Sequence, residues 1–195
     1  MRRARLVFAL FVAVVLAVPS MASAAAPETA DVMDQNGIDV FAADGASLVR
    51  QPNGARISVR IPAPVPGQYV YPMGVTPGSP EVFTLWAFVF NHPEHCSFPC
   101  GGDDTNNPDV EFGVYNVTGH VNAGQWLTMS GRFGVGDPAG APPGVTPHPL
   151  SNPGGAEFHV AITSHGELDP ATLPGEFSIP TGNPGCGCWW VAIFD

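Results

Sequence analysis

Residues 125–135, Gln125-Trp-Leu-Thr-Met-Ser-Gly-Arg-Phe-Gly-Val135, carry the clearest alternation in the chain. One face of this segment would hold Leu127, Met129, Phe133 and Val135, and the other Trp126, Thr128, Ser130 and Arg132. A period of two residues is typical of a β-strand with one buried face. The preceding Asn122-Ala-Gly124 predicts a hairpin turn back to a second alternating run, residues 110–121.

Further short strands are expected on both sides of this hairpin. Apolar and polar residues alternate at 57–61 and at 156–163. Residues 81–90 (EVFTLWAFVF) are apolar almost throughout, and an apolar segment, residues 189–194, lies near the C-terminus. Weaker strand signals lie at Gln68–Tyr71 and Glu176–Ile179. With 23 Gly and 22 Pro, many of them in long stretches such as residues 136–155, the connections are expected to be long loops. We therefore predict an all-β fold, an antiparallel β-sandwich of Greek-key or barrel-like form.

The first 24 residues have the organisation of a secretory signal peptide. Arginines at positions 2, 3 and 5 precede an apolar run from Leu6 to Val18, and Ala22-Ser23-Ala24 matches a cleavage site. The run is too short to span a bilayer, which needs about 20 residues. We expect a secreted protein, extracellular or periplasmic, with a signal peptide at 1–24, a loosely ordered segment at 25–50 and one domain at 51–195.

Charge restricts the partners of the mature chain. Beyond residue 24 it keeps four arginines and no lysine against 17 acidic residues, a net charge of −13. Such a charge repels phosphate backbones, so nucleic-acid binding is not expected, and it disfavours adhesion to anionic membranes. A cation, a glycan or a protein remains a candidate partner.

Four cysteines, Cys96, Cys100, Cys186 and Cys188, are expected to form disulfides, because a secreted protein meets an oxidising environment. Four cysteines allow three pairings. Local pairing is favoured for Cys96 with Cys100, and the second pair is left open. The alternative is a zinc or copper site that combines these thiols with His92 and His95.

Two further sets of side chains are candidate metal ligands. The histidines are His92, His95, His120, His159 and His165. His159 and His165 would lie about 20 Å apart if one strand carries both, whereas His120 could approach His159 across the sheet. The acidic stretch 101–111 offers Asp103, Asp104 and Asp109 as oxygen ligands for calcium. Glu94, beside His92 and His95, is a candidate general base.

Three segments resemble a family of secreted bacterial proteins with no established function. They are TLWAFVFNHPEHC (84–96), YNVTGHV (115–121) and AEFHVAITSHG (156–166). This resemblance implies a secreted single domain and no particular activity. The second and third segments are also similar to chordin-type (CHRD) domains, which are compared with the copper/zinc superoxide dismutase sandwich. Those domains carry His-x-His where this chain has Glu157-Phe-His159, which counts against a dismutase-like copper site.

The sequence contains no nucleophile elbow, zincin motif or Gly-rich phosphate loop. We therefore expect a secreted, acidic, non-enzymatic domain that binds a partner or has a structural role. One alternative is a protein that binds or depends on copper, zinc or calcium. The other is a carbohydrate-binding module that presents Trp126 on an exposed face.

Overall fold

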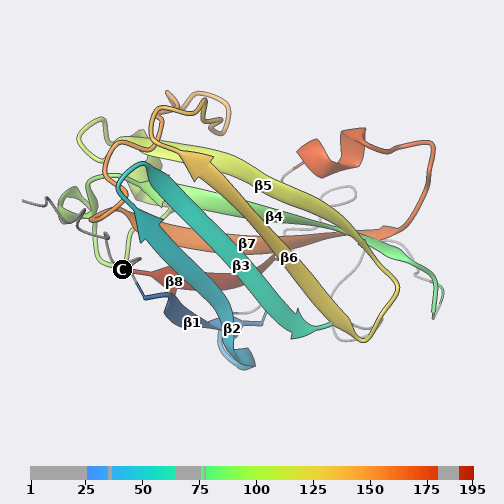
Figure 1. Ribbon diagram of the computed structural model, residues 1–195. Coiled ribbons are helices and arrows are strands. Elements are labelled where there is room, and N and C mark those ends of the chain that lie inside the picture. The colour runs from blue at the N-terminus through green and yellow to red at the C-terminus, as the bar shows by residue number, and fades with distance from the viewer. Residues whose placement is uncertain (1–25, 35–36, 65–75, 77, 180–188) are drawn as a thin grey trace, which may run out of the picture.

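The computed structural model describes residues 26–34, 37–64, 76, 78–179 and 189–195, and it is an all-β protein (Figure 1). Its strands are β1 (Glu28–Met33), β2 (Val40–Gln51), β3 (Gly54–Pro62), β4 (Glu81–Phe90), β5 (Phe112–Asn122), β6 (Trp126–Gly134), β7 (Glu157–Glu167) and β8 (Trp189–Phe194). Three short 3-10 helices, η1 (Pro93–His95), η2 (Gly102–Asn106) and η3 (Gly175–Ser178), lie in the connections. No helix in the described ranges is long and apolar enough to cross a membrane.

All eight strands form one antiparallel sheet with the order β5-β4-β7-β8-β1-β2-β3-β6, which confirms the predicted fold class. The sheet is nearly closed into a barrel, because the hairpin from β5 to β6 brings its two ends together. A Cβ on Gly131 would lie 2.5 Å from the carbonyl oxygen of Val117, so only glycine permits this approach of β6 to β5. Near-closure leaves little unpaired strand edge.

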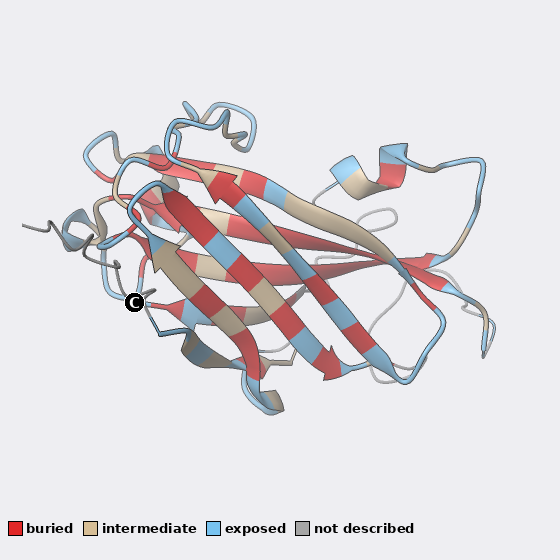
Figure 2. Ribbon diagram, viewed as in Figure 1, coloured by how far each residue is buried: buried red, intermediate tan, exposed pale blue. Residues whose placement is uncertain are grey.

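The main core fills the interior of the sheet. Strands β3 and β6 contribute alternate residues, and the intervening residues face solvent, as the banding of buried and exposed positions in Figure 2 shows. Leu127, Met129 and Phe133 are buried as predicted, whereas Val135 follows the end of β6 and is 46% exposed.

Strands β4 and β7 are buried on both faces (Figure 2). Their inward residues, such as Leu85 and Ile162, join the main core. Outward, Phe90 packs with Cys100, Val110 and Phe112 in a second, smaller cluster. The continuous apolar pattern of residues 81–90 therefore reflects a second layer of loops outside the sheet.

Two expectations are corrected. The segment 25–50 was expected to be loose, but its described residues include β1 and most of β2, which belong to the sheet, so the domain begins well before residue 51. The polar β1 is held by backbone pairing with β2 on one side and β8 on the other, which needs no strong side-chain pattern.

Glu176–Ile179 falls on η3 and is not a strand. The signal peptide and Gln68–Tyr71 lie outside the described residues.

Candidate ligand-binding site

A pocket of about 370 Å³ lies on the outer face of the sheet, where β4 and β7 carry their second layer. Its aromatic lining comes from Phe88, Phe90 and Phe112. The other lining residues are Gly101, Gly102, Thr105, Pro142, His159, Ala161 and Val191. The lining is mostly apolar, with a single ionisable side chain, which is the usual character of a small-molecule site.

Strand register places these side chains on one face. Phe88 of β4 pairs with His159 of β7, and Phe90 pairs with Phe112 of β5. Ala161 pairs with Val191 of β8 in the same way. Because side chains alternate along a strand, the residues between them, such as Val89 and Phe158, enter the main core instead.

His159 is held in one orientation by a buried carboxylate. Its Nε2 lies 2.5 Å from Oε1 of Glu157, which is only 1% exposed. The same oxygen accepts a hydrogen bond from the backbone N–H of Cys100, at 2.9 Å. Nε2 is thereby directed at Glu157, and Nδ1 is the ring nitrogen left for another partner. The pocket thus combines apolar walls with one oriented hydrogen-bonding group.

A disulfide and a buried aspartate shape the segment over the pocket. Cys96 and Cys100 are joined, with an S–S distance of 2.14 Å, which confirms the local pairing and removes these thiols from any metal site. Cys186 and Cys188 lie outside the described residues. Desolvation alone would raise the pKa of Asp104, but hydrogen bonds from the backbone N–H groups of Ser97 and Gly101 and from the Ser97 hydroxyl lower it. Asp104 therefore binds its own loop, as a charged carboxylate.

A second cavity, of about 330 Å³, shares Thr105 and Phe112 with the first. Its remaining lining is more polar and consists of Asn106, Asn107, Pro108, Gly144, Thr146 and His148. The two cavities place amide, hydroxyl and imidazole groups next to an aromatic pocket.

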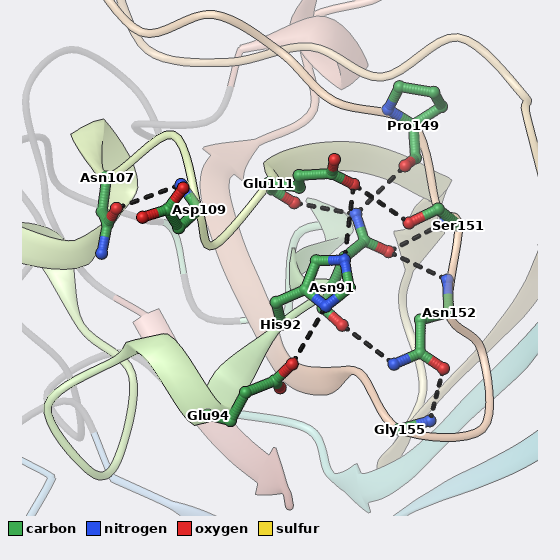
Figure 3. Close-up of polar contacts among 10 residues, drawn as sticks. All are labelled: Asn91, His92, Glu94, Asn107, Asp109, Glu111, Pro149, Ser151, Asn152 and Gly155. Carbon is green, nitrogen blue, oxygen red and sulfur yellow. Dashed lines mark hydrogen bonds and ion pairs between the residues drawn. The ribbon is translucent and has the colours of Figure 1, made fainter.

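Asn91 is the centre of a hydrogen-bond network at the end of β4 (Figure 3). Its amide nitrogen donates to the carbonyl oxygens of Glu111 and Pro149, and its side-chain oxygen accepts from the backbone N–H groups of Ser151 and Asn152. Asn91 is fully buried, and its amide is fully used. This network attaches the long 136–156 connection to the sheet and holds Glu111 in a left-handed conformation, with φ of 53°.

His92 lies beside this network, between two carboxylates (Figure 3). Its Nδ1 is 3.1 Å from Oε1 of Glu94, and its Nε2 is 3.8 Å from Oε2 of Glu111. Hydrogen bonds from the backbone N–H of Glu94 and from His92 lower the pKa of Glu94. Glu94 is therefore a weaker base than an ordinary glutamate, which is a poor property for a general base at neutral pH.

The structure scatters most of the candidate metal ligands. His92 immediately precedes η1 and His95 ends it, with ring centroids 6.3 Å apart. His159 and His165 occupy opposite ends of one continuous strand, β7. His120 pairs with Phe83, five positions along β4 from the partner of His159, so these two histidines do not approach each other.

The acidic candidates do not converge either. Asp103 and Asp109 are exposed, and Asp104 is buried in its own loop. No group of three or more His, Cys, Asp or Glu side chains in the described part of the chain is placed to hold a metal ion.

Trp126 lies on a different surface, the outer face of β6, where it is 50% exposed. The guanidinium of Arg60 stands over its ring, 4.3 Å from the centroid. Sequence reasoning selected Trp126 and His159 but missed Phe88, Phe90 and Glu157. The signal for the two phenylalanines was the apolar pattern of residues 81–90, because the outward positions of such a strand need a covering layer.

Comparisons of the chain with protein-family models, curated proteins and solved structures gave no match. What the protein does is therefore inferred from the geometry of the pocket and its surroundings.

Proposed function

We propose that this chain is a secreted, non-enzymatic binding domain that takes the aromatic or branched aliphatic group of a small ligand into the Phe88–Phe90–Phe112 pocket. The observation that carries the proposal is one concave apolar pocket with a single oriented polar group, His159. Burial of the apolar group supplies affinity, at about 25 cal/mol per Å² removed from water. Nδ1 of His159 offers one hydrogen bond to a polar group of the ligand beside that apolar group.

One observation supports binding over catalysis. Glu157 orients His159, yet the serine or threonine that lines the pocket is Thr105, whose hydroxyl donates to the carbonyl oxygen of Gly102 at 2.8 Å and not to His159. A nucleophile activated by His159 would need a direct hydrogen bond to the imidazole. The arrangement instead matches a fixed recognition group in an apolar site.

Titration with N-phenyl-1-naphthylamine tests the proposal, because this neutral aromatic amine fluoresces strongly in apolar surroundings and carries one N–H donor. We expect saturable binding of one probe per chain. Ala161→Phe places a ring inside the pocket and should abolish binding, whereas Ala123→Phe adds the same ring to the exposed β5–β6 turn and should not.

Two milder variants keep the test decisive if Ala161→Phe unfolds. Ala161→Val should weaken binding partially, and Phe88→Ala, which removes one aromatic wall of the pocket at a half-buried position, should weaken it about tenfold or more. Binding that ignores every pocket variant, or no binding at all, would contradict the proposal. Near-stoichiometric copper, zinc or calcium retained by the purified protein after dialysis would favour the metal-binding alternative.

A further inference from the structure

Three of the four arginines in the described residues lie on one surface of this acidic protein. The described residues contain four arginines, and the chain has no lysine. Arg50 is used internally, in an ion pair with Glu28 at 2.8 Å and in hydrogen bonds to the carbonyl oxygens of Pro153 and Asp195. The other three, Arg56, Arg60 and Arg132, are all exposed on the outer face of β3 and β6.

Register places the three arginines and Trp126 in one stripe. Arg56 of β3 stands directly opposite Arg132 of β6, and Arg60 stands opposite Thr128. Two residues further along the same face, Pro62 pairs with Trp126. The guanidinium of Arg60 lies over the indole ring of Trp126. Ser58 and Ser130 pair between the two ends. We call the set Arg56, Ser58, Arg60, Trp126, Thr128, Ser130 and Arg132 the arginine stripe.

The stripe is electrostatically unfavourable by itself. Like charges directly opposite each other on neighbouring strands destabilise a sheet. Neither Arg56 nor Arg132 makes an ion pair with a described residue, and the outward positions of β3 and β6 contain no acidic residue. A chain with 17 carboxylates thus leaves its positive charges unneutralised on one exposed face, where an external anion would neutralise them.

We propose that the arginine stripe binds an anionic polysaccharide, a chain of uronate sugars. The guanidinium fork of arginine matches a carboxylate with two parallel hydrogen bonds. The exposed face of Trp126 can stack on the apolar face of a sugar ring, and the hydroxyls of Ser58, Thr128 and Ser130 can bond sugar hydroxyls. From Trp126 to Arg132 the stripe is about 20 Å long, which suits an extended chain of several sugars.

The net negative charge of the protein does not prevent this contact. Charges separated by more than about 8–10 Å of solvent are largely screened at physiological ionic strength, so distant carboxylates act weakly at the stripe. At the Arg132 end, the carboxylate of Asp137 accepts a hydrogen bond from the backbone N–H of Gly134 and makes no ion pair with Arg132. The guanidinium fork also fits the phosphates of a nucleic acid, so single-stranded DNA is the polyanion from which the uronate polymer has to be distinguished. This surface is separate from the Phe88–Phe90–Phe112 pocket, so the inference does not rest on the proposed function.

Isothermal titration with polygalacturonate at low salt tests the inference, with fully methyl-esterified polygalacturonate as the matched uncharged polymer. We expect binding of the acidic polymer and at least tenfold weaker binding of the ester. Arg56→Ser with Arg132→Ser should weaken binding of the acidic polymer about tenfold or more, since charged hydrogen bonds are lost. Arg132→Lys should give an intermediate loss, because it keeps the charge without the fork.

Trp126→Ala should weaken binding of the acidic polymer, whereas Phe98→Ala, which removes a ring that is 78% exposed elsewhere, should not. Because the substituted side chains are exposed, the variants should fold, which their circular dichroism spectra check. The inference is overturned by equal binding of acid and ester, by affinity unchanged in the arginine variants, or by no binding. Arginine-dependent dimerisation in sedimentation would assign the stripe to a second copy of this chain, and equal affinity for single-stranded DNA would make it a general polyanion surface.

Discussion

Strands β3 and β6 and strands β4 and β7 belong to the same sheet but are covered differently. On β3 and β6, every second residue faces solvent, and the exposed positions hold serine, threonine, arginine and Trp126 (Figure 2). On β4 and β7 the outward positions are buried as well, under η2, η3 and the disulfide segment. The inner faces of both pairs join the main core. The two pairs therefore differ in whether loops cover the outer face of the sheet.

The covering layer determines the kind of site that each half can form. Loops that pack over a sheet leave concave gaps, and the Phe88–Phe90–Phe112 pocket is one of them. The uncovered half is an extended surface with no enclosure, which suits a long, charged partner. Strands β4 and β7 are therefore the doubly covered half of the sheet, and strands β3 and β6 are the singly covered half.

The largest effect is expected from a charge placed on the outward side of β4. Val82 is fully buried, so Val82→Asp should lower the free energy of unfolding by about 4 kcal/mol or more, because it buries an unpaired carboxylate. Thr128→Asp, on the outward side of β6 opposite Arg60, should change it by no more than about 0.5 kcal/mol. Urea unfolding followed by circular dichroism measures both, and equal effects would contradict the difference between the halves.

An intermediate effect is expected from a buried histidine in the doubly covered half. Desolvation lowers the pKa of His165, which is 1% exposed, to about 4, and its Nε2 lies 2.7 Å from the Thr84 hydroxyl. The unfolded chain takes up this proton near pH 6.5 and the folded protein only near pH 4. Stability should therefore be fully present above pH 6.5 and should fall by about 3 kcal/mol as the pH drops through this window.

Urea unfolding across this pH range, with His165→Gln as the comparison, isolates the contribution of His165. On acidification, the free energy of unfolding of the variant should fall by about 3 kcal/mol less than that of the unaltered protein. His95→Gln removes an exposed histidine and should behave like the unaltered protein. A His165→Gln profile that follows the unaltered protein would mean that the outer face of β7 is accessible to protons and water.

The smallest effect is expected in the singly covered half. Arg132→Ser removes one of two arginines that stand directly opposite each other, so the free energy of unfolding should rise by about 0.3 kcal/mol at low salt. High salt should abolish the gain, because exposed charges are screened. Destabilisation at every salt concentration would show that Arg132 has a structural partner and would weaken the case for an unpaired arginine stripe.

Much of the fold could be predicted from local pattern. Residues 126–134 alternate because one face of β6 is buried, and the run 189–194 matches β8. The pairing of Cys96 with Cys100 was also accessible, since four residues separate them. The prediction failed at residues 28–33, whose strand depends on backbone pairing with distant β2 and β8 and has little apolar pattern of its own.

The candidate sites were only partly predictable. His159 and Trp126 were selected as residue types, but their settings were not. Glu157 orients His159 because both project from the outer side of one strand under the Cys96–Cys100 segment, and Arg60 covers Trp126 only once β3 and β6 are paired.

The sequence by itself determined which residues face inward on a clearly alternating strand such as β6, where the hairpin turns, and how little positive charge the chain carries, because these are properties of neighbouring residues. Only the tertiary structure decided which strands receive a second layer and which side chains meet across the sheet. Register between strands distant in sequence is set by the fit of the whole core. For that reason Arg56 meets Arg132, and Phe88 meets His159, only in the folded protein.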